Sequence, residues 1–206
     1  MTIARRLMTS GGGGTFGAID YNDEFNGPNV DWVVVSSADF GDTTPGTVHI
    51  PSGNRIARPR VPPVPFTVTA YCSSILFDDI DNDYANASLA VGEGSNLGTT
   101  GPKHYALHGL DVAFLGHIGV IDGLWTNYST GPVQGSYVAL DGIEYQVPHY
   151  QRLVVHSGTN VDLYYSFNGS SWSTYATGQN PNLASVESVL LLSYACTTEW
   201  DWVRFS

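Results

Sequence analysis

The stretch that decides the fold is Arg152-Leu-Val-Val-His-Ser-Gly-Thr-Asn-Val-Asp-Leu-Tyr-Tyr-Ser-Phe-Asn-Gly-Ser-Ser-Trp172. It contains two strand-like segments, residues 152–156 and 161–167, separated by a short polar turn. Large apolar residues occupy every second position of the second segment, as in a half-buried strand: Val161, Leu163, Tyr165 and Phe167. Asn168-Gly169 is a favoured tight-turn pair. The stretch therefore predicts a hairpin followed by another strand at residues 171–175.

The same alternation of short strands and turns extends over most of the chain. Further strands are predicted at residues 66–71, 87–91, 136–140, 186–195 and 200–205. Two more are predicted between residues 105 and 120, broken near Gly109 or Gly116. The 23 glycines and 11 prolines interrupt the chain too often for long helices. The fold class predicted is all-β, a jelly roll or sandwich of two antiparallel sheets.

The composition excludes several classes of partner. With 8 Lys and Arg against 19 Asp and Glu, the net charge is −11, so binding to nucleic acid or to an anionic membrane surface is disfavoured. No apolar stretch is long enough for membrane insertion. Apolar residues make up 42% of the chain, which argues for a folded core.

The first 20 residues differ from the remainder. They contain Gly11-Gly-Gly-Gly14, a flexible hinge, and the pair Arg5 and Arg6, but no apolar stretch typical of a secretory signal. We expect residues 1–20 to form an extended N-terminal arm and residues 21–206 to form one domain. Such an arm either frays or docks on a partner, and we favour docking through these arginines. Residues 59–65 hold four prolines and are expected to form a stiff linker or an edge crossing.

Three stretches resemble the concanavalin A-like lectin/glucanase sandwich superfamily. The segment Arg152 to Trp172 is similar to the family's hairpin pair, with Asn168 where Asp is commoner. Glu199-Trp-Asp-Trp-Val-Arg-Phe205 resembles its closing strand, and Asp23-Glu-Phe-Asn-Gly27 with Asp31-Trp32 resembles its opening segment. The resemblance implies two stacked antiparallel sheets, one of them concave, with Trp172 capping the core. It also implies glycan binding in many members, calcium in some and glycan cleavage in others.

Catalysis is not predicted. Retaining glucanases of this fold carry a Glu-x-Asp-x-x-Glu strand, because two carboxylates must face one another about 5–5.5 Å apart. The nearest match is Glu199-Trp-Asp201, but Arg204 stands at the position of the second Glu. Asp23 and Glu24 are adjacent and would point to opposite faces of a strand. The alternative is a pair assembled from distant strands.

Two groups of residues carry metal-ligating side chains. Asp79, Asp81 and Asp83 alternate as at the start of a calcium loop, but the Gly and Glu that an EF-hand requires are absent. The alternatives are a looser Ca²⁺ cage or a solvated acidic loop, so Ca²⁺ is the one cofactor considered. His104 and His108 lie about 13 Å apart if the segment is a strand, and we interpret them as ordinary histidines.

Two cysteines and several aromatic residues complete the candidate positions. Cys72 and Cys196 lie in apolar strand-like runs and are interpreted as buried thiols, with a disulfide as the alternative. The glycan-binding candidates lie in one Gly-bounded loop: Trp125, Asn127 and Tyr128. The alternative for Trp125 is packing beneath its own loop. The tryptophans in strand context are expected in the core or at its rim: Trp172, Trp200 and Trp202.

Architecture and resemblance together suggest a non-enzymatic structural protein of a bacteriophage virion. It would be a capsid decoration or tail-associated adhesive module on the virion surface, made in the host cytoplasm. The expected partners are other virion proteins, further copies of the chain in a homo-oligomer, and cell-surface glycans. The alternatives are a stand-alone carbohydrate-binding lectin domain and a glycoside hydrolase.

Overall fold

The computed structural model describes part of the chain. The described residues are 22–25, 32–34, 39–40, 46–77, 86–93, 104–110, 114–121, 137–139, 148–181 and 183–206. Side chains are described for all of these except 39–40, 77, 86, 104–110, 114–121 and 137–139, where the backbone alone is used. This part contains fourteen strands and no helix, and so no helix that could cross a membrane.

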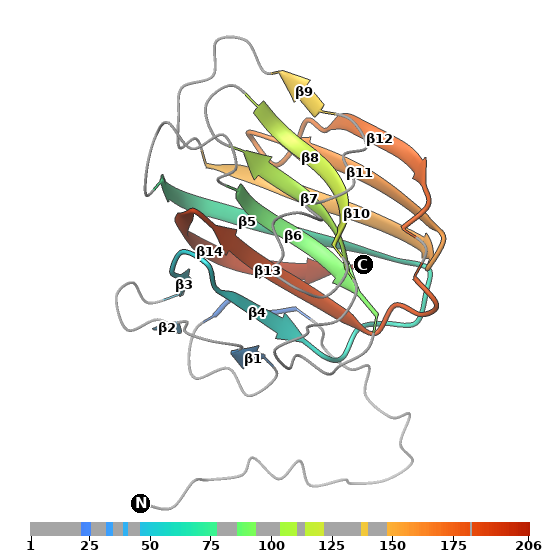
Figure 1. The fold of residues 1–206 in the computed structure, drawn as a ribbon, viewed down its shortest axis with the longest axis horizontal. Helices are drawn as coiled ribbons and strands as arrows, with labels where there is room; N and C mark the ends of the chain where they lie inside the picture. Colours follow the sequence, from blue (N-terminus) through green and yellow to red (C-terminus); the bar gives the residue numbers. More distant parts are fainter. Residues whose placement is uncertain are drawn as a thin grey trace, which may run out of the picture.

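Within each of the two sheets the strands are antiparallel. The sheets are stacked face to face, with the strand axes of one sheet roughly aligned with those of the other (Figure 1). Sheet A has the order β12 (Ser173–Gln179), β11 (Asn160–Ser166), β10 (His149–Ser157), β5 (Phe66–Phe77), β14 (Cys196–Phe205), β3 (Val48–Ile50), β2 (Asp39–Phe40). Sheet B has the order β1 (Val33–Val34), β4 (Arg55–Arg58), β13 (Ser188–Tyr194), β6 (Asn86–Gly92), β7 (His104–Leu110), β8 (Phe114–Ile121), β9 (Tyr137–Ala139). The predicted jelly-roll sandwich is confirmed.

The hairpin predicted from the opening stretch is present. β10 pairs with β11, and residues 167–172 then turn the chain into β12. The strand between residues 105 and 120 breaks after Leu110, one residue beyond Gly109. The proline-rich residues 59–65 connect β4 of sheet B to β5 of sheet A, which confirms a crossing between the sheets.

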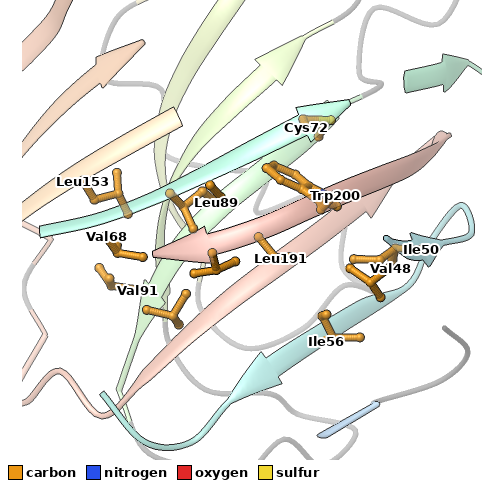
Figure 2. Packing of buried hydrophobic residues seen from close by; sticks show 14 of the residues in the cluster. Val48, Ile50, Ile56, Val68, Cys72, Leu89, Val91, Leu153, Leu191 and Trp200 are labelled. Carbon is orange, nitrogen blue, oxygen red and sulfur yellow. The ribbon is translucent and has the colours of Figure 1, made fainter. Parts of the chain in front are cut away.

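The core fills the space between the two sheets. Figure 2 shows side chains of both sheets converging there, with Val68, Leu153 and Trp200 from sheet A and Leu89 and Leu191 from sheet B. Each of these five side chains is fully buried. Burial of an aliphatic or aromatic side chain contributes roughly 1.5–3 kcal/mol, so this continuous cluster is the main source of stability.

The opening segment is held by one carboxylate. Asp23 Oδ1 accepts the backbone N–H of Phe25 at 2.8 Å, and Oδ2 accepts the indole N–H of Trp32 at 2.7 Å. Asp23 also exchanges two backbone hydrogen bonds with Val203 of β14. Asp23 and Trp32 of the opening motif therefore have a structural role, because their hydrogen bonds hold this segment against β14 of sheet A.

One polar side chain crosses the core. Gln151 is fully buried on the inner face of β10, and its amide binds the opposite sheet at two points. Its oxygen accepts the N–H of Leu89 at 2.8 Å and its nitrogen donates to the carbonyl of Ala87 at 2.9 Å. Buried amides are tolerated when both ends are hydrogen-bonded, so Gln151 ties the sheets together without an unpaired amide.

The two cysteines form no disulfide bond and are fully buried. Burial raises the pKa of the Cys72 thiol, and the proximity of Cys196 raises it further. A thiol held protonated in this way is a poor nucleophile. The interpretation as two buried thiols is confirmed.

Candidate functional site

The two sheets present different outer faces. On the outer face of sheet B, four apolar side chains are fully buried and form a cluster separate from the main core: Ala57, Ala90, Leu190 and Leu192. On the outer face of sheet A, the side chains of β10 at the corresponding alternate positions are only half-buried. Among the side chains that the structure describes, those of β10 on the outward side of sheet A are therefore more accessible to solvent than this cluster on sheet B.

The strand register places aromatic residues in one transverse row on that face. Trp202 of β14 pairs with Tyr71 of β5, Tyr71 pairs with Tyr150 of β10, and Tyr150 pairs with Ser166 of β11. Residues directly opposite in adjacent strands share a face, with Cβ atoms about 4.5–5.5 Å apart. Three aromatic side chains from segments distant in the sequence thus become neighbours.

A β-bulge brings Trp202 into this row. Strict alternation would put Trp200 and Trp202 on the same face. The register of β14 against β5 shifts between Trp200 and Trp202, leaving Asp201 without an opposite residue. Trp200 is therefore fully buried in the core while Trp202 is half-buried on the outer face. Bulges commonly redirect side chains in this way.

The rings pack into a continuous surface that we call the aromatic platform, consisting of Tyr71, Tyr150, Trp172 and Trp202. Tyr71 and Tyr150 stack at 4.4 Å between ring centroids. Tyr150 contacts Trp202 at 5.8 Å and, edge-on, Trp172 at 6.4 Å. Gly169 lies so close to Tyr150 that an added Cβ would be 3.0 Å from the ring.

A second transverse row lies on the same face, two residues further along each strand, and it is polar. It runs from Arg204 through Thr69 and Arg152 to Tyr164 and Thr174. Its two arginines lie on tryptophans of the aromatic platform. The guanidinium carbon of Arg152 is 3.4 Å from the centroid of the Trp172 ring, and that of Arg204 is 4.3 Å from that of Trp202. These cation–π contacts hold the rings in place while leaving the face charged.

Several polar groups of this face have no hydrogen-bond partner within the part of the chain that the structure describes. This holds for the hydroxyl groups of Tyr71, Tyr150 and Tyr164 and the indole N–H groups of Trp172 and Trp202. Burial, with smaller contributions from Tyr150 and Asp201, raises the pKa of Tyr71, so its hydroxyl remains a hydrogen-bond donor at neutral pH. The face thus combines flat apolar rings with unengaged donors and acceptors.

The structure corrects the role expected for Trp172. Its ring is not part of the core but lies half-buried against Arg152 and Tyr150 on the outer face. The turn at residues 167–172 carries it to the side of the sheet where Arg152 projects. The expectation of a core position is confirmed for Trp200.

The other candidate residues fall outside the described residues or are tested only in part. Those outside are Trp125, Asn127 and Tyr128; Asp79, Asp81 and Asp83; and Arg5 and Arg6. His104 and His108 lie on strand β7, as expected. Among side chains that the structure describes, no three His, Cys, Asp or Glu residues gather in a way that would hold a metal ion.

The nearest match to a glucanase motif does not form a facing pair. Because of the bulge, Glu199 pairs with Ser74 of β5 whereas Asp201 has no opposite residue. Glu199 lies 3.7 Å from His49 Nδ1. Arg204, at the position of the missing Glu, forms an ion pair with Glu24 at 3.0 Å.

Comparison with solved structures identifies the fold. Lectin II from Ulex europaeus superposes with a TM-score of 0.60 over 92% of this chain and 98% of the lectin, at 10% sequence identity. The xylan β-1,4-xylosidase from Bacillus halodurans C-125 superposes with a TM-score of 0.62 at 12% identity, and the GH43 protein BlXynB from Bacillus licheniformis with 0.59 at 15%. These two superpositions include 96% and 89% of this chain, respectively, but only 41% and 38% of the two Bacillus proteins.

The sequence matches no known family model, and no curated protein matches it. At these low identities the structural likeness identifies the fold, which is the concanavalin A-like sandwich of lectins and glycosidases. The chain corresponds to nearly the whole of the Ulex europaeus lectin and to less than half of each of the two Bacillus proteins.

Proposed function

We propose that this lectin-like sandwich binds carbohydrate without cleaving it, and that it does so on the aromatic platform of sheet A. The supporting observation is the outward gathering of Tyr71, Tyr150, Trp172 and Trp202 with their hydroxyl and indole N–H groups unengaged by the described residues. Sugar rings present C–H groups to flat aromatic faces and hydroxyls to polar groups at the edges. This face offers both kinds of contact.

The platform is suited to an extended chain rather than to a single sugar. Its aromatic row crosses three adjacent strands, β14, β5 and β10, which lie about 4.8 Å apart. The row therefore spans roughly 10 Å, about the length of two sugar units, and Trp172 extends it beyond Tyr150. Each contact is weak, so affinity on a cell surface would depend on several copies acting together.

The test is retardation of the purified chain in gels containing neutral polysaccharides such as xylan, glucan, mannan and galactan. We expect at least one polysaccharide to retard the wild type, and Trp202→Ala to lose most of that retardation. Leu76→Ala is the matched control, because Leu76 is 60% exposed on β5 of the same sheet but lies outside the platform. Thermal melting of each variant checks folding.

Two outcomes would contradict this proposal. One is the absence of retardation on every polysaccharide tested, including acidic ones. The other is loss of binding in Trp125→Ala with full binding in Trp202→Ala, which would place the site in the loop that contains Trp125. Release of reducing sugar by the wild type, abolished in Glu199→Gln or Asp201→Asn, would contradict the non-catalytic part.

The biological setting that we propose is the surface of a bacteriophage virion, as a decoration or tail-associated module. It is supported by the sequence: a glycine hinge and the pair Arg5 and Arg6 precede one acidic β-domain. In this arrangement the arm attaches to the particle and the platform faces outward. Deletion of residues 1–20 should abolish co-purification with particles while leaving polysaccharide retardation intact. Co-purification without the arm would contradict it.

A further inference from the structure

Building on the proposed carbohydrate function, we propose that the preferred ligand is an acidic polysaccharide, and that Arg152 receives the carboxylate of one of its uronic acid residues. Arg152 lies in the polar row directly beside the aromatic platform. A uronic acid presents the same C–H face as a neutral sugar and carries a carboxylate at the edge of its ring. The juxtaposition of Trp172, Tyr150 and Arg152 matches both features.

The guanidinium of Arg152 is fixed but not saturated. Its Nε donates to Thr69 Oγ1 at 3.2 Å, and its plane lies over Trp172. Its Nη1 and Nη2 groups have no hydrogen-bond partner among the described residues. These two groups form the fork that binds a carboxylate in a bidentate manner, and the two existing contacts already hold it in a single orientation.

Arg152 also has no counter-ion among the residues that the structure describes, although the chain has a net charge of −11. The other arginine of the polar row differs, because Arg204 binds Glu24 through both Nε and Nη2. Burial lowers the pKa of Arg152, opposed in part by Tyr164, so its charge is partly desolvated. A guanidinium remains charged under these conditions, and a carboxylate ligand would supply the missing countercharge.

The carboxylates of the same face leave this position open. Glu24 is engaged by Arg204. Asp162, on the row beyond Arg152, accepts hydrogen bonds from His156 at 2.9 Å and from the N–H of Gly178 at 2.6 Å. The charge of Asp201 acts on Tyr71, which lies between Trp202 and Tyr150 in the aromatic row. Of the two arginines in the polar row, Arg152 is therefore the one whose charge no described carboxylate balances.

The test compares acidic oligosaccharides with their own methyl esters by isothermal titration calorimetry on the full chain. The probes are oligomers of galacturonate, glucuronate and mannuronate. For at least one of them we expect the acid to bind about ten-fold more tightly than its ester at low salt, as a charge-assisted hydrogen bond predicts. Added salt should reduce this ratio.

Variants assign the effect to one side chain. Arg152→Gln should bind the acid no better than the ester, and Arg152→Lys, which keeps the charge but loses the fork, should retain only part of the ratio. Arg60→Gln is the matched control, because it removes the same charge from an exposed position in the proline-rich crossing and should preserve the ratio. The comparison of acid and ester on the wild type needs no variant and stands even if Arg152→Gln fails to fold.

The outcomes separate this inference from the function on which it rests. Equal affinity for acid and ester in all three pairs, or a ratio unchanged in a folded Arg152→Gln, would overturn the role of Arg152 while leaving neutral carbohydrate binding in place. Binding of no polysaccharide, neutral or acidic, would overturn both. A ratio lost equally in Arg60→Gln would show a general charge effect and would also overturn it.

Discussion

Two pairs of tryptophans in this molecule differ in burial and in the hydrogen bonding of their indole N–H groups. Trp32 and Trp200 are buried, and each indole N–H is satisfied within the protein, by Asp23 Oδ2 at 2.7 Å and by Thr198 Oγ1 at 2.9 Å. Trp172 and Trp202 are half-buried, each lies under an arginine, and neither indole N–H has a described partner. Tryptophan therefore stabilises the core on the inner side of sheet A and presents hydrogen-bond donors to solvent on the outer side.

This contrast separates the two tasks of the sheet. On the inner side, the indole N–H groups of Trp32 and Trp200 and the amide of Gln151 are all hydrogen-bonded, because an unpaired buried polar group costs stability. Outer residues are packed against one another but left incomplete in hydrogen bonding, which costs little where water reaches them. A surface that is ordered before binding loses less conformational entropy when a ligand arrives.

The largest effect is expected from exchanging the two kinds of tryptophan for alanine. Trp200→Ala should lower the free energy of unfolding by about 3–5 kcal/mol, because it opens a cavity in the core. Trp202→Ala should lower it by no more than about 1.5 kcal/mol, the scale of exposed aromatic contacts. Urea denaturation measures both. Similar losses would mean that the outer ring also serves chiefly to hold the fold together.

A smaller effect is expected from the amide that crosses the core. Gln151→Met keeps the volume but leaves the N–H of Leu89 and the carbonyl of Ala87 without their partner. The loss should be about 1–3 kcal/mol, the cost of unsatisfied buried groups. Arg152→Met, on the neighbouring outward position, should cost less in the same urea titration. A neutral Gln151→Met would mean that the surrounding strands close over the gap.

A still smaller effect is expected at Gly169, and it tests whether this glycine sets the position of the Tyr150 ring in the aromatic platform. Gly169 has φ +71°, and an added Cβ would press on the Tyr150 ring at 3.0 Å. Gly53 has φ +73° with nothing within 4 Å, which makes Gly53→Ala a matched control for backbone strain. Each should lose about 1–2 kcal/mol from the left-handed backbone. Only Gly169→Ala should also weaken polysaccharide retardation, and equal retardation by the two variants would contradict the seating role.

The smallest effect concerns acid stability on the outer face. Burial acts to raise the pKa of Asp162, but its hydrogen bonds from His156 and Gly178 outweigh burial and hold the pKa below its ordinary value of 3.8. Because the folded-state pKa is lowered, the stabilisation is complete above the ordinary value and is lost as pH falls through the folded-state pKa. Urea midpoints between about pH 5 and about pH 2 should therefore fall less steeply in Asp162→Asn. Parallel curves for the two proteins would show that this carboxylate does not contribute.

The strands themselves were largely predictable from the sequence, because their apolar residues alternate with a period of two and their turns carry Gly, Asn and Pro. The hairpin of β10 and β11 follows directly from residues 152–167. The paired-sheet architecture followed from the resemblance of three stretches, and the structural neighbours bear it out.

The platform was not predictable in the same way. It depends on the register of β5 against both β10 and β14, which brings together Tyr71, Tyr150 and Trp202 from separate parts of the chain. Strict alternation placed Trp202 with Trp200, and only the bulge at Asp201 separates them. The signal that was present is the arginine two residues after an aromatic residue in both strands, Tyr150 with Arg152 and Trp202 with Arg204. That repeated spacing places an arginine and an aromatic side chain on the same face twice.

The position of β14 has a consequence for how the domain is made. This strand is the last of those described, yet it lies between β5 and β3, and Ser206 exchanges two backbone hydrogen bonds with Thr67. Sheet A therefore lacks a central member until translation has passed Ser206. On the ribosome, β5 and β3 would keep open edges, exposed to chaperones and to mispairing, until β14 emerges and pairs with them.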